Sequence, residues 1–584
     1  MNWDLNDLYK GFDDPKYNED FNKVIELVKD YNDLSLLIGK EEELTLILKY
    51  IKINEELTKL VRTIASFNSL TNATDVSNQK SLINMAKIRN VLNGTTKPSV
   101  LFTRFFKTID FNKYIDNDKI KNNLFQLEKT KESAKYLLSE EEEILYNKLS
   151  ELSSSSWSQI QSLLTSKLDV DVLGKTYTLS EVRNLAYDNN EKIRKDAYNA
   201  ELKAYEKIDE VVAMSLSNIK REVVLMNDLR GYKNVLEPTL LRSNMEEETL
   251  VAMINAMLDY RDDFAKYLKA KAKHLNHKNG LPFYDLFAPV GNLTKTYTYE
   301  EAKELIIEAF NGYSSDLGNY AKKAFDKNWI DPFPKKGKRG GAFCSNQPQL
   351  KQSRILSNFT GSLSDVSTLA HELGHGYHGE IISENSPLNW SYPMPLAETA
   401  SIFCETIVTN HLLKDLNKDE EILSVLEIAL QGDTQVIIDI LSRYIFETEI
   451  FKLADGPISK DQMNKLMIKA QKEAYKDGLD HNVLHPYMWL NKGHYYSAGL
   501  NFYNFPYAFG LLFGKGLYAK YLEDKTSFIK NYDKLLKLTT HASVEDVAMS
   551  MNIDVTKKEF WISSLELIKK DIEKVTRLLN EVSK

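Results

Sequence analysis

The chain has 584 residues, 43% of them hydrophobic and 27% charged, and its formal net charge at pH 7 is −8. This composition is ordinary for a large soluble protein with two or more subdomains, and the acidic balance argues against nucleic acid as a partner. The N-terminus lacks the apolar run of a signal peptide and no stretch reaches the length of a membrane span, so we expect no membrane contact. The two cysteines, Cys344 and Cys404, have no paired spacing, so we expect a reducing compartment and a cytoplasmic protein.

Helical periodicity dominates the first half of the chain. Residues 1 to about 165 read as successive helices, separated by turn signals such as Asn93-Gly94. Residues 168–179 alternate in hydrophobicity around a central glycine, which is typical of a small β-hairpin. Helices resume from 180 to about 277 and again over 299–310. The sequence therefore predicts a mainly α fold.

Between residues 332 and 359 the pattern changes to glycines followed by short alternating runs. We predict two short strands here, which end just before the next helix. The edge of such a sheet could pair with an extended peptide through backbone hydrogen bonds that ignore side-chain identity. In that case Gly341, Ala342 and Phe343 would bind substrate. A small sheet with a purely structural role is the alternative, and the sequence alone leaves both open.

The next helix carries the motif His-Glu-Leu-Gly-His at residues 371–375. Because an α-helix advances 100° per residue, His371 and His375 lie one turn apart on one face and can bind one tetrahedral metal ion. Glu372 lies beside that face, where its carboxylate would miss the metal but reach a water bound to it. Two ligands and a general base within one helical turn are the arrangement of zinc hydrolases.

Two glycines in the same helix bear on the alternative that the motif is accidental. Gly374 and Gly376 each cost about 1 kcal/mol of helix propensity relative to Ala, and a purely structural helix gains nothing from them. A helix pressed against another backbone would need them. The motif arises by chance in roughly one or two per cent of chains of this length, so we interpret it as catalytic.

A catalytic zinc ion has three protein ligands and one open position. His378 shares the ligand face, but three nitrogens from one straight helix would be nearly collinear, and the metzincin pattern fails because position 381 is Ile. The third ligand should therefore come from another helix, which we predict over Leu396–Leu413. We predict Glu398 as that ligand and Glu405 as the carboxylate that orients a ligand histidine through its free ring N–H. A lone surface Glu is the alternative for Glu398.

Residues 485–518 form an aromatic segment in which His494 lies among many tyrosines, including Tyr503 and Tyr507. Imidazole and phenol groups can donate hydrogen bonds to the oxyanion that forms when a peptide carbonyl becomes tetrahedral. An aromatic core segment is the alternative. The number of hydroxyls argues against that alternative for all of the tyrosines, because each buried hydroxyl needs a partner.

Taken together, these stretches resemble the thimet oligopeptidase and oligoendopeptidase F family of zinc metallopeptidases, and most of all its oligoendopeptidase F branch. The resemblance runs nearly end to end, and its last three stretches, in this order and spacing, are the most specific. The stretches that carry it are Trp3–Tyr9, Gly340–Cys344, Asp365–His375, Ala397–Ser401, His494–Tyr496 and Phe502–Ala508.

The resemblance implies an architecture and a set of roles. The implied fold is a mostly helical, two-lobed ellipsoid with a small β-sheet beside the zinc helix and a deep cleft that admits short peptides. We expect an N-terminal helical lobe at 1–190 and a catalytic domain at 191–584. The implied roles are one zinc ion bound by His371, His375 and Glu398, proton transfer by Glu372, and contact with the substrate and transition state by His494, Tyr503 and Tyr507.

The sequence therefore predicts a cytoplasmic zinc oligoendopeptidase that cuts internal bonds of short, unstructured peptides. Zinc lowers the pKa of its bound water to roughly 7, and Glu372 would take the water's proton and pass it to the leaving amine. One alternative is a peptidyl-dipeptidase of related helical fold, which would need a cationic pocket for the free carboxylate of its substrate. Another is a catalytically inactive peptide-binding protein. The oligomeric state stays open.

Overall fold

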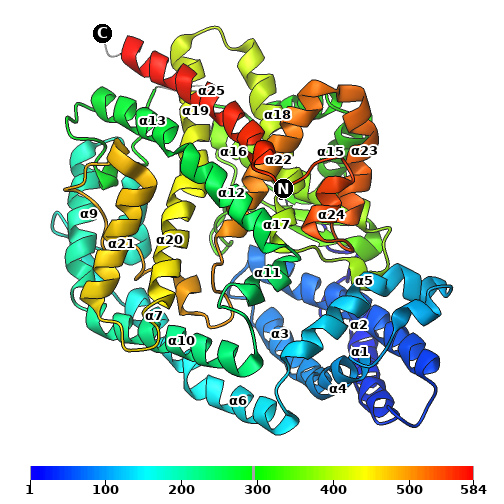
Figure 1. Cartoon of the computed structure of the whole chain (residues 1–584). Helices are drawn as coiled ribbons and strands as arrows, with labels where there is room; N and C mark the ends of the chain where they lie inside the picture. Colours follow the sequence, from blue (N-terminus) through cyan, green and yellow to red (C-terminus); the bar gives the residue numbers. More distant parts are fainter. Residues whose placement is uncertain (1, 292–295, 583–584) are drawn as a thin grey trace. The chain divides into compact units, whose positions relative to one another are not determined.

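The computed structural model describes residues 2–291 and 296–582, and helices make up most of it (Figure 1). The mainly α fold predicted from the sequence is confirmed. By the density of its internal contacts the chain divides into two compact units. The first unit comprises Met1–Lys135, Lys295–Leu412 and Lys520–Asn552, and the second comprises Tyr136–Thr294, Leu413–Ala519 and Ile553–Lys584. The lobe and domain predicted at 1–190 and 191–584 stay a prediction.

The first unit contains long N-terminal helices, a small sheet and the helices that follow it. Its helices are α1 (Pro15–Ser35), α2 (Glu43–Thr74), α3 (Gln79–Leu92), α4 (Thr96–Phe106), α5 (Asp118–Ser133), α14 (Tyr299–Asn311), α15 (Ser315–Asp326), α16 (Leu363–Ile382), α17 (Met394–Ala397), α18 (Thr399–Asp415), α23 (Lys525–Leu538) and α24 (Val544–Met549). Its strands are β3 (Ile330–Asp331), β4 (Phe343–Gln347) and β5 (Gln352–Leu356).

The second unit is almost entirely helical. Its helices are α6 (Glu140–Leu152), α7 (Ser154–Ser166), α8 (Leu179–Asn184), α9 (Glu191–Tyr205), α10 (Asp209–Arg230), α11 (Glu237–Ser243), α12 (Glu247–Asp259), α13 (Arg261–His274), α19 (Asp419–Thr434), a π-helical turn (Gln435–Asp439), α20 (Ile440–Phe451), α21 (Lys460–Tyr475), α22 (Phe505–Glu523) and α25 (Lys558–Val582). Its two strands are β1 (Asp169–Val172) and β2 (Lys175–Thr178).

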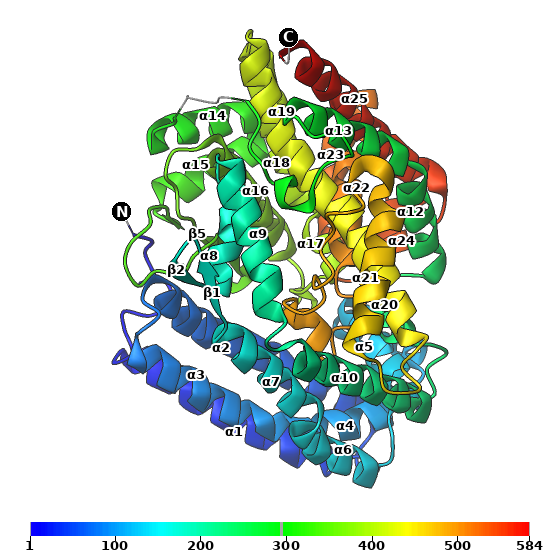
Figure 2. The same cartoon turned by 90° about the vertical axis from the view of Figure 1, so that its left-hand side faces the viewer.

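In the first unit, α1, α2 and α3 lie side by side (Figure 2). Helix α1 begins where the Asp14 side chain accepts a hydrogen bond from the Lys16 backbone, with a proline in the first turn. Tyr9 packs edge-to-face on Tyr17 and Phe67, with ring centroids 5.0 and 5.4 Å apart. These aromatic contacts form the core of the N-terminal helices.

A three-stranded sheet lies against α16 in the same unit. The strand order is β3-β5-β4, in which β5 is parallel to β3 and antiparallel to β4. Both β4 and β5 pack on α16, and Leu356 of β5 joins the core of the N-terminal helices. The two strands predicted before the motif helix are confirmed, whereas the two-residue strand β3 was not predicted.

In the second unit, α25 packs along α12, α13 and α19 (Figure 1). Its apolar residues repeat at helical spacing and are buried, as Leu565, Ile568 and Ile572 illustrate. The predicted hairpin is also confirmed, since β1 and β2 pair antiparallel across a tight turn at Leu173-Gly174, both with positive φ. Within the described part of the chain, no helix is long and apolar enough to span a bilayer.

Candidate metal centre

Helix α16 begins at a side-chain cap formed by Ser362 and Asp365. The Ser362 side chain accepts a hydrogen bond from the backbone N–H of Asp365, and the Asp365 carboxylate accepts in return from the backbone N–H groups of Thr360, Gly361 and Ser362 at 2.9–3.1 Å. This reciprocal cap satisfies N–H groups that the first turn leaves without partners. The cap fixes where the helix begins, so the motif at 371–375 falls in its middle.

Three side chains that sequence reasoning had grouped converge beside α16. The Nε2 atoms of His371 and His375 lie 3.2 and 3.4 Å from Oε2 of Glu398, and one ligand atom from each residue lies within 4.8 Å of the others. A tetrahedral ion with bonds of roughly 2.0–2.1 Å holds its ligand atoms about 3.3 Å apart. The two measured separations match this spacing, so the donor set fits a zinc ion in both chemistry and geometry.

The electrostatics of the same cluster suit a bound cation. Burial lowers the pKa of His371, but hydrogen bonds to Glu398 and Glu405 outweigh it and raise that pKa to about 10. Burial raises the pKa of Glu398, but His371 and His375 outweigh it and bring that pKa down to about 2. The two carboxylates therefore hold a proton on His371, and a divalent cation would satisfy them in its place.

Glu398 reaches this position because the predicted helix over Leu396–Leu413 is interrupted. Helix α17 ends at Ala397, Glu398 has φ −88° and ψ 3°, and α18 begins at Thr399. The prediction of one continuous helix was therefore wrong at this residue. The Ser401 hydroxyl, one turn on, donates to Oε2 of Glu398 at 2.7 Å and fixes the carboxylate. Sequence reasoning missed Ser401, although it lies in one of the stretches that carry the family resemblance.

Glu405 contacts the other side of His371. Its Oε2 lies 3.3 Å from Nδ1 of His371, while Nε2 of the same ring faces Glu398. A carboxylate on the second ring nitrogen fixes the tautomer and the orientation of a ligand histidine. The geometry thus suits the orienting role that the sequence suggested for Glu405.

Glu372 lies beside the ligand atoms without joining them. It is 6% exposed and lines the same cavity, of about 370 Å³, as His371, His375 and Glu398. Burial, with a smaller contribution from the charge of Glu398, raises the pKa of Glu372 to about 7. A carboxylate with such a pKa can take up and release a proton near neutral pH.

The glycines of α16 let other groups approach the helix closely. A Cβ atom on Gly374 would lie 2.6 Å from the carbonyl oxygen of Ala400, in α18. A Cβ on Gly376 would lie 1.9 Å from the Tyr320 hydroxyl, and one on Gly379 would lie 2.1 Å from the side chain of Asn346. The expectation that this helix presses against another backbone is met at Gly374. The glycine also explains how α16 and the start of α18 come close enough for Glu398, the residue before α18, to reach the two histidines.

The three-stranded sheet also contacts α16 through a side-chain hydrogen bond. The Asn346 amide in β4 donates to the carbonyl oxygen of His375 at 3.0 Å. Ala342 and Phe343 line the same cavity as the ligand atoms, and Gly341 precedes them with φ 78°. Strand β4 pairs with β5 along one edge, and among the described residues no strand pairs with its other edge. That edge is where an extended peptide could add.

His378, the rejected ligand candidate, is a buried residue with structural contacts. Its ring stacks on Tyr392 with centroids 4.2 Å apart, and its Nε2 lies 2.8 Å from the Thr539 hydroxyl. His378 is also absent from the set of side chains that converge on a common point.

The aromatic segment lies in the second unit, where it brings His494, Tyr503 and Tyr507 together. The rings of His494 and Tyr503 stack with centroids 5.3 Å apart, and the hydroxyls of Tyr503 and Tyr507 are 2.7 Å apart. All three side chains are partly exposed. Tyr495 and Tyr496, by contrast, are fully buried, so the core interpretation is right for these two tyrosines.

The tautomer of His494 follows from a residue 51 positions away. Nη1 of Arg443 lies 3.1 Å from Oδ1 of Asn504, and an arginine can only donate, so the amide oxygen faces it. The Asn504 amide nitrogen then donates to Nε2 of His494 at 2.8 Å. Burial, followed by the charges of Arg443, Lys220 and Lys492, lowers the pKa of His494 to about 3. His494 is therefore a neutral imidazole with its proton on Nδ1, able to donate. Sequence reasoning missed Arg443 and Asn504.

Two protein-family models match this chain. The family model described as peptidase family M3 matches residues 184–567, and a second model, described as oligopeptidase F, matches 109–169. The chain belongs to peptidase family M3. The predicted resemblance is thereby confirmed, and the chain is a peptidase.

Relatives of this M3 peptidase cover its whole length. An oligoendopeptidase F homolog of Lactococcus lactis subsp. lactis is 24% identical over 100% of this chain and 98% of its own, and one of Borreliella burgdorferi is 26% identical over 99% and 98%. A crystal structure from Chlamydophila abortus superposes with a TM-score of 0.82 at 20% identity, covering 99% and 98% of the two chains. Oligoendopeptidase-F from Enterococcus faecium superposes with a TM-score of 0.73 at 16% identity, covering 97% and 99%. The fold is therefore shared along the entire chain.

Proposed function

We propose that this M3-family peptidase is a cytoplasmic, zinc-dependent oligoendopeptidase that hydrolyses internal bonds of short, unstructured peptides. The observation that carries the proposal is the convergence of His371, His375 and Glu398 at separations suited to one tetrahedral ion, with Glu372 in the same cavity. The names of the full-length relatives support the same substrate class.

Zinc, when bound to these three residues, polarises a peptide carbonyl and lowers the pKa of water. Glu372 accepts the proton of the attacking water on its carboxylate and donates it to the nitrogen of the leaving amine. Glu372 acts as a base in the first transfer and as an acid in the second. Glu405 holds the His371 ring through Nδ1, and Ser401 holds the Glu398 carboxylate, so the ligand atoms keep their positions throughout.

Other residues would bind the peptide and the negative charge that develops on its carbonyl oxygen. The free edge of β4, with Gly341, Ala342 and Phe343, offers backbone groups to an extended peptide. This mode is insensitive to side chains, which suits a peptidase of many short sequences. As the family resemblance implies, we propose that Nδ1–H of His494 and the hydroxyl of Tyr503 or Tyr507 donate hydrogen bonds to the oxyanion. A cleft that excludes folded proteins, as the family resemblance implies, would limit the substrates to short peptides.

Cleavage mapping tests this proposal against the peptidyl-dipeptidase alternative. The substrate is an unstructured octapeptide with an acetylated N-terminus, prepared once with a free carboxylate and once as the C-terminal amide. Mass spectrometry should find the same internal cut in both forms, and chelation should abolish it until zinc is restored. Release of a C-terminal dipeptide from the free acid alone would favour the peptidyl-dipeptidase, and no cleavage by the zinc-loaded protein would favour an inactive peptide-binding protein.

A further inference from the structure

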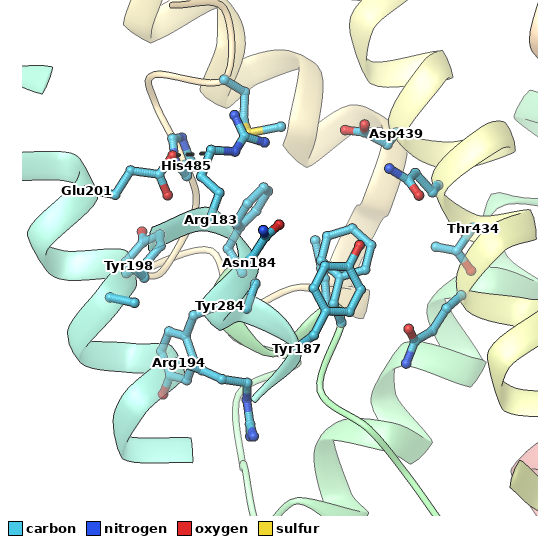
Figure 3. Close-up of a pocket in the computed structure, with 18 of the residues that line it drawn as sticks. Arg183, Asn184, Tyr187, Arg194, Tyr198, Glu201, Tyr284, Thr434, Asp439 and His485 are labelled. Carbon is cyan, nitrogen blue, oxygen red and sulfur yellow. Dashed lines mark ion pairs between the residues drawn. The ribbon is translucent and has the colours of Figure 1, made fainter. Parts of the chain in front are cut away.

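The second unit contains a pocket that the proposed reaction does not use (Figure 3). Its volume is about 210 Å³. Arg183, Glu201 and His485 lie on one side of the pocket, and Asp439 and Thr434 lie on the helix opposite (Figure 3). A space of this size admits a single amino-acid residue or a small organic acid.

Much of the pocket wall is aromatic. Tyr187 packs against Phe287 with ring centroids 5.0 Å apart, and Tyr198 packs against Tyr284 at 5.8 Å. Tyr187 is 56% exposed, so the aromatic wall reaches the protein surface. Rings in this arrangement offer flat apolar faces on which an aromatic or branched apolar group can stack. The aromatic residues that line the pocket are Tyr187, Tyr198, Tyr267, Phe283, Tyr284, Phe287 and Tyr475.

The charged groups in the wall leave one cation unpaired. Arg443 forms an ion pair with Asp439, and Nε of Arg183 lies 3.9 Å from Oε1 of Glu201. Lys492 is partly buried and lines the pocket, and in the described part of the chain it has no hydrogen-bond or ion-pair partner. Burial, followed by the charge of Arg443, lowers the pKa of Lys492 to about 7. Lys492 is therefore only partly charged near neutral pH, and a carboxylate bound beside it would stabilise its charged form.

Two more residues in the wall have buried nitrogen atoms without a hydrogen-bond partner in the described structure. His485 is 2% exposed, and its Nε2 lies 3.6 Å from Oε1 of Glu201, too far for a hydrogen bond. The backbone of His485 is held on both sides by the Gln471 side chain, at 2.8 and 3.0 Å. Nε of Arg443 is likewise buried without a partner. Buried polar groups normally have partners, and groups without them indicate a site that a ligand or water completes.

We propose that this pocket binds a small organic carboxylate whose charge pairs with Lys492 and whose aromatic or branched apolar group stacks among the tyrosines. The carboxylate can belong to a free acid or to the C-terminal residue of a peptide, because both present the same chemistry to the pocket. Lys492, the one unpaired lysine among the described residues of the wall, can pair with one carboxylate. A metal ion is disfavoured by the cationic lining, and a phosphate dianion would be only half neutralised. The inference does not depend on the proposed peptidase mechanism.

The affinity of the pocket for a carboxylate tests this proposal better than the rate of peptide hydrolysis does. Arg443 contacts Asn504, and Asn504 contacts His494, so a change in the pocket can alter catalysis indirectly. The probes are N-acetyl-L-phenylalanine, its C-terminal amide, and the peptide Ala-Ala-Phe. Their binding to the full chain is measured by isothermal titration calorimetry in the Glu372→Gln background, which slows hydrolysis. Each titration is repeated after the metal has been removed by chelation.

N-acetyl-L-phenylalanine should bind, and its amide should bind at least tenfold more weakly, because the charge-assisted hydrogen bond to the carboxylate is lost. Lys492→Met should weaken the acid at least tenfold, and Lys492→Arg should restore most of the affinity. Tyr187→Ala, at an exposed position where the fold tolerates the change, should also weaken it. The matched control is Lys460→Met, since Lys460 is a partly exposed lysine of the same unit outside the pocket. This control should leave the affinity unchanged.

Binding of Ala-Ala-Phe as tightly as the free acid would identify peptide C-termini as a source of the ligand, and binding of the acid alone would identify free acids. Either result supports the proposal. Equal binding of the acid and the amide, an unchanged affinity in both Lys492→Met and Tyr187→Ala, or loss of binding when the metal is removed would each overturn it. The last result would place the bound carboxylate at the metal centre instead.

Discussion

Replacing Gly374 by alanine should disturb the metal centre although residue 374 is not a ligand. The added Cβ would lie 2.6 Å from the carbonyl oxygen of Ala400, 2.7 Å from Cα of Ser401 and 2.9 Å from the carbonyl carbon of Ala400. All three are backbone atoms, which no side-chain rotation can move aside. Restoring ordinary contact at about 3.4 Å or more requires α18 to retreat by roughly 0.8 Å, and overpacking of this kind costs about 1–3 kcal/mol.

That displacement would move the start of α18 together with Glu398 and Ser401. Ligand bonds to zinc are only about 2 Å long, so a shift of this size should lower zinc affinity at least tenfold. Alanine also gains about 1 kcal/mol of helix propensity, which partly offsets the overpacking. The free energy of unfolding of the metal-free protein should therefore fall by less than the free energy of zinc binding. Zinc affinity is measured by competition with a fluorescent chelator, and stability by thermal unfolding of the metal-free protein.

Gly432→Ala is the matched control. Gly432 also lies within a helix, α19, but a Cβ there would meet nothing within 4 Å. This variant should keep its zinc affinity and gain a little stability. If Gly374→Ala bound zinc as tightly as the wild type, the close approach of α16 and α18 could not be what positions Glu398, and the reasoning would be refuted.

Three further predictions follow from the site. Glu372→Gln should retain zinc and the fold while kcat falls on the order of 10²–10⁴, and loss of zinc would instead make Glu372 a ligand. Tyr503→Phe or Tyr507→Phe should lower kcat on the order of 10²–10³ with KM, zinc content and thermal stability nearly unchanged; wild-type kcat in both variants would assign the oxyanion to other donors. Ser401→Ala should weaken zinc retention several-fold in the chelator competition, because Glu398 loses the hydroxyl that fixes it, and unchanged retention would make that hydrogen bond irrelevant.

Periodicity and motif spacing predict those features of the fold that depend on local sequence. The alternation around Leu173-Gly174 depends on a few neighbouring residues, and the hairpin that it predicts is present. The motif at 371–375 likewise places two histidines on one helical face by spacing alone. Strand β3 was missed because two residues carry no periodic signal, and only pairing with β5 defines it.

Tertiary contacts determine the rest, and the sequence shows them poorly. The apolar run after Pro395 favours one uninterrupted helix, whereas the chain breaks at Glu398, where α18 packs on Gly374. Arg443, which sets the tautomer of His494, is a single arginine in a helix 51 residues away and gives no local signal. Ser401 and Asn504 lie within the stretches that resemble the family, so closer attention to those stretches could have found them.

The metal content of two glutamate variants tests the central claim most directly. Wild-type protein, Glu398→Ala and Glu405→Ala are each stripped by chelation, reloaded with zinc, dialysed and measured by elemental analysis. The proposed centre predicts one zinc per chain in the wild type, severe loss in Glu398→Ala, and substantial retention in Glu405→Ala, because only Glu398 would contact the ion. Full zinc in Glu398→Ala together with loss in Glu405→Ala would contradict the proposed centre.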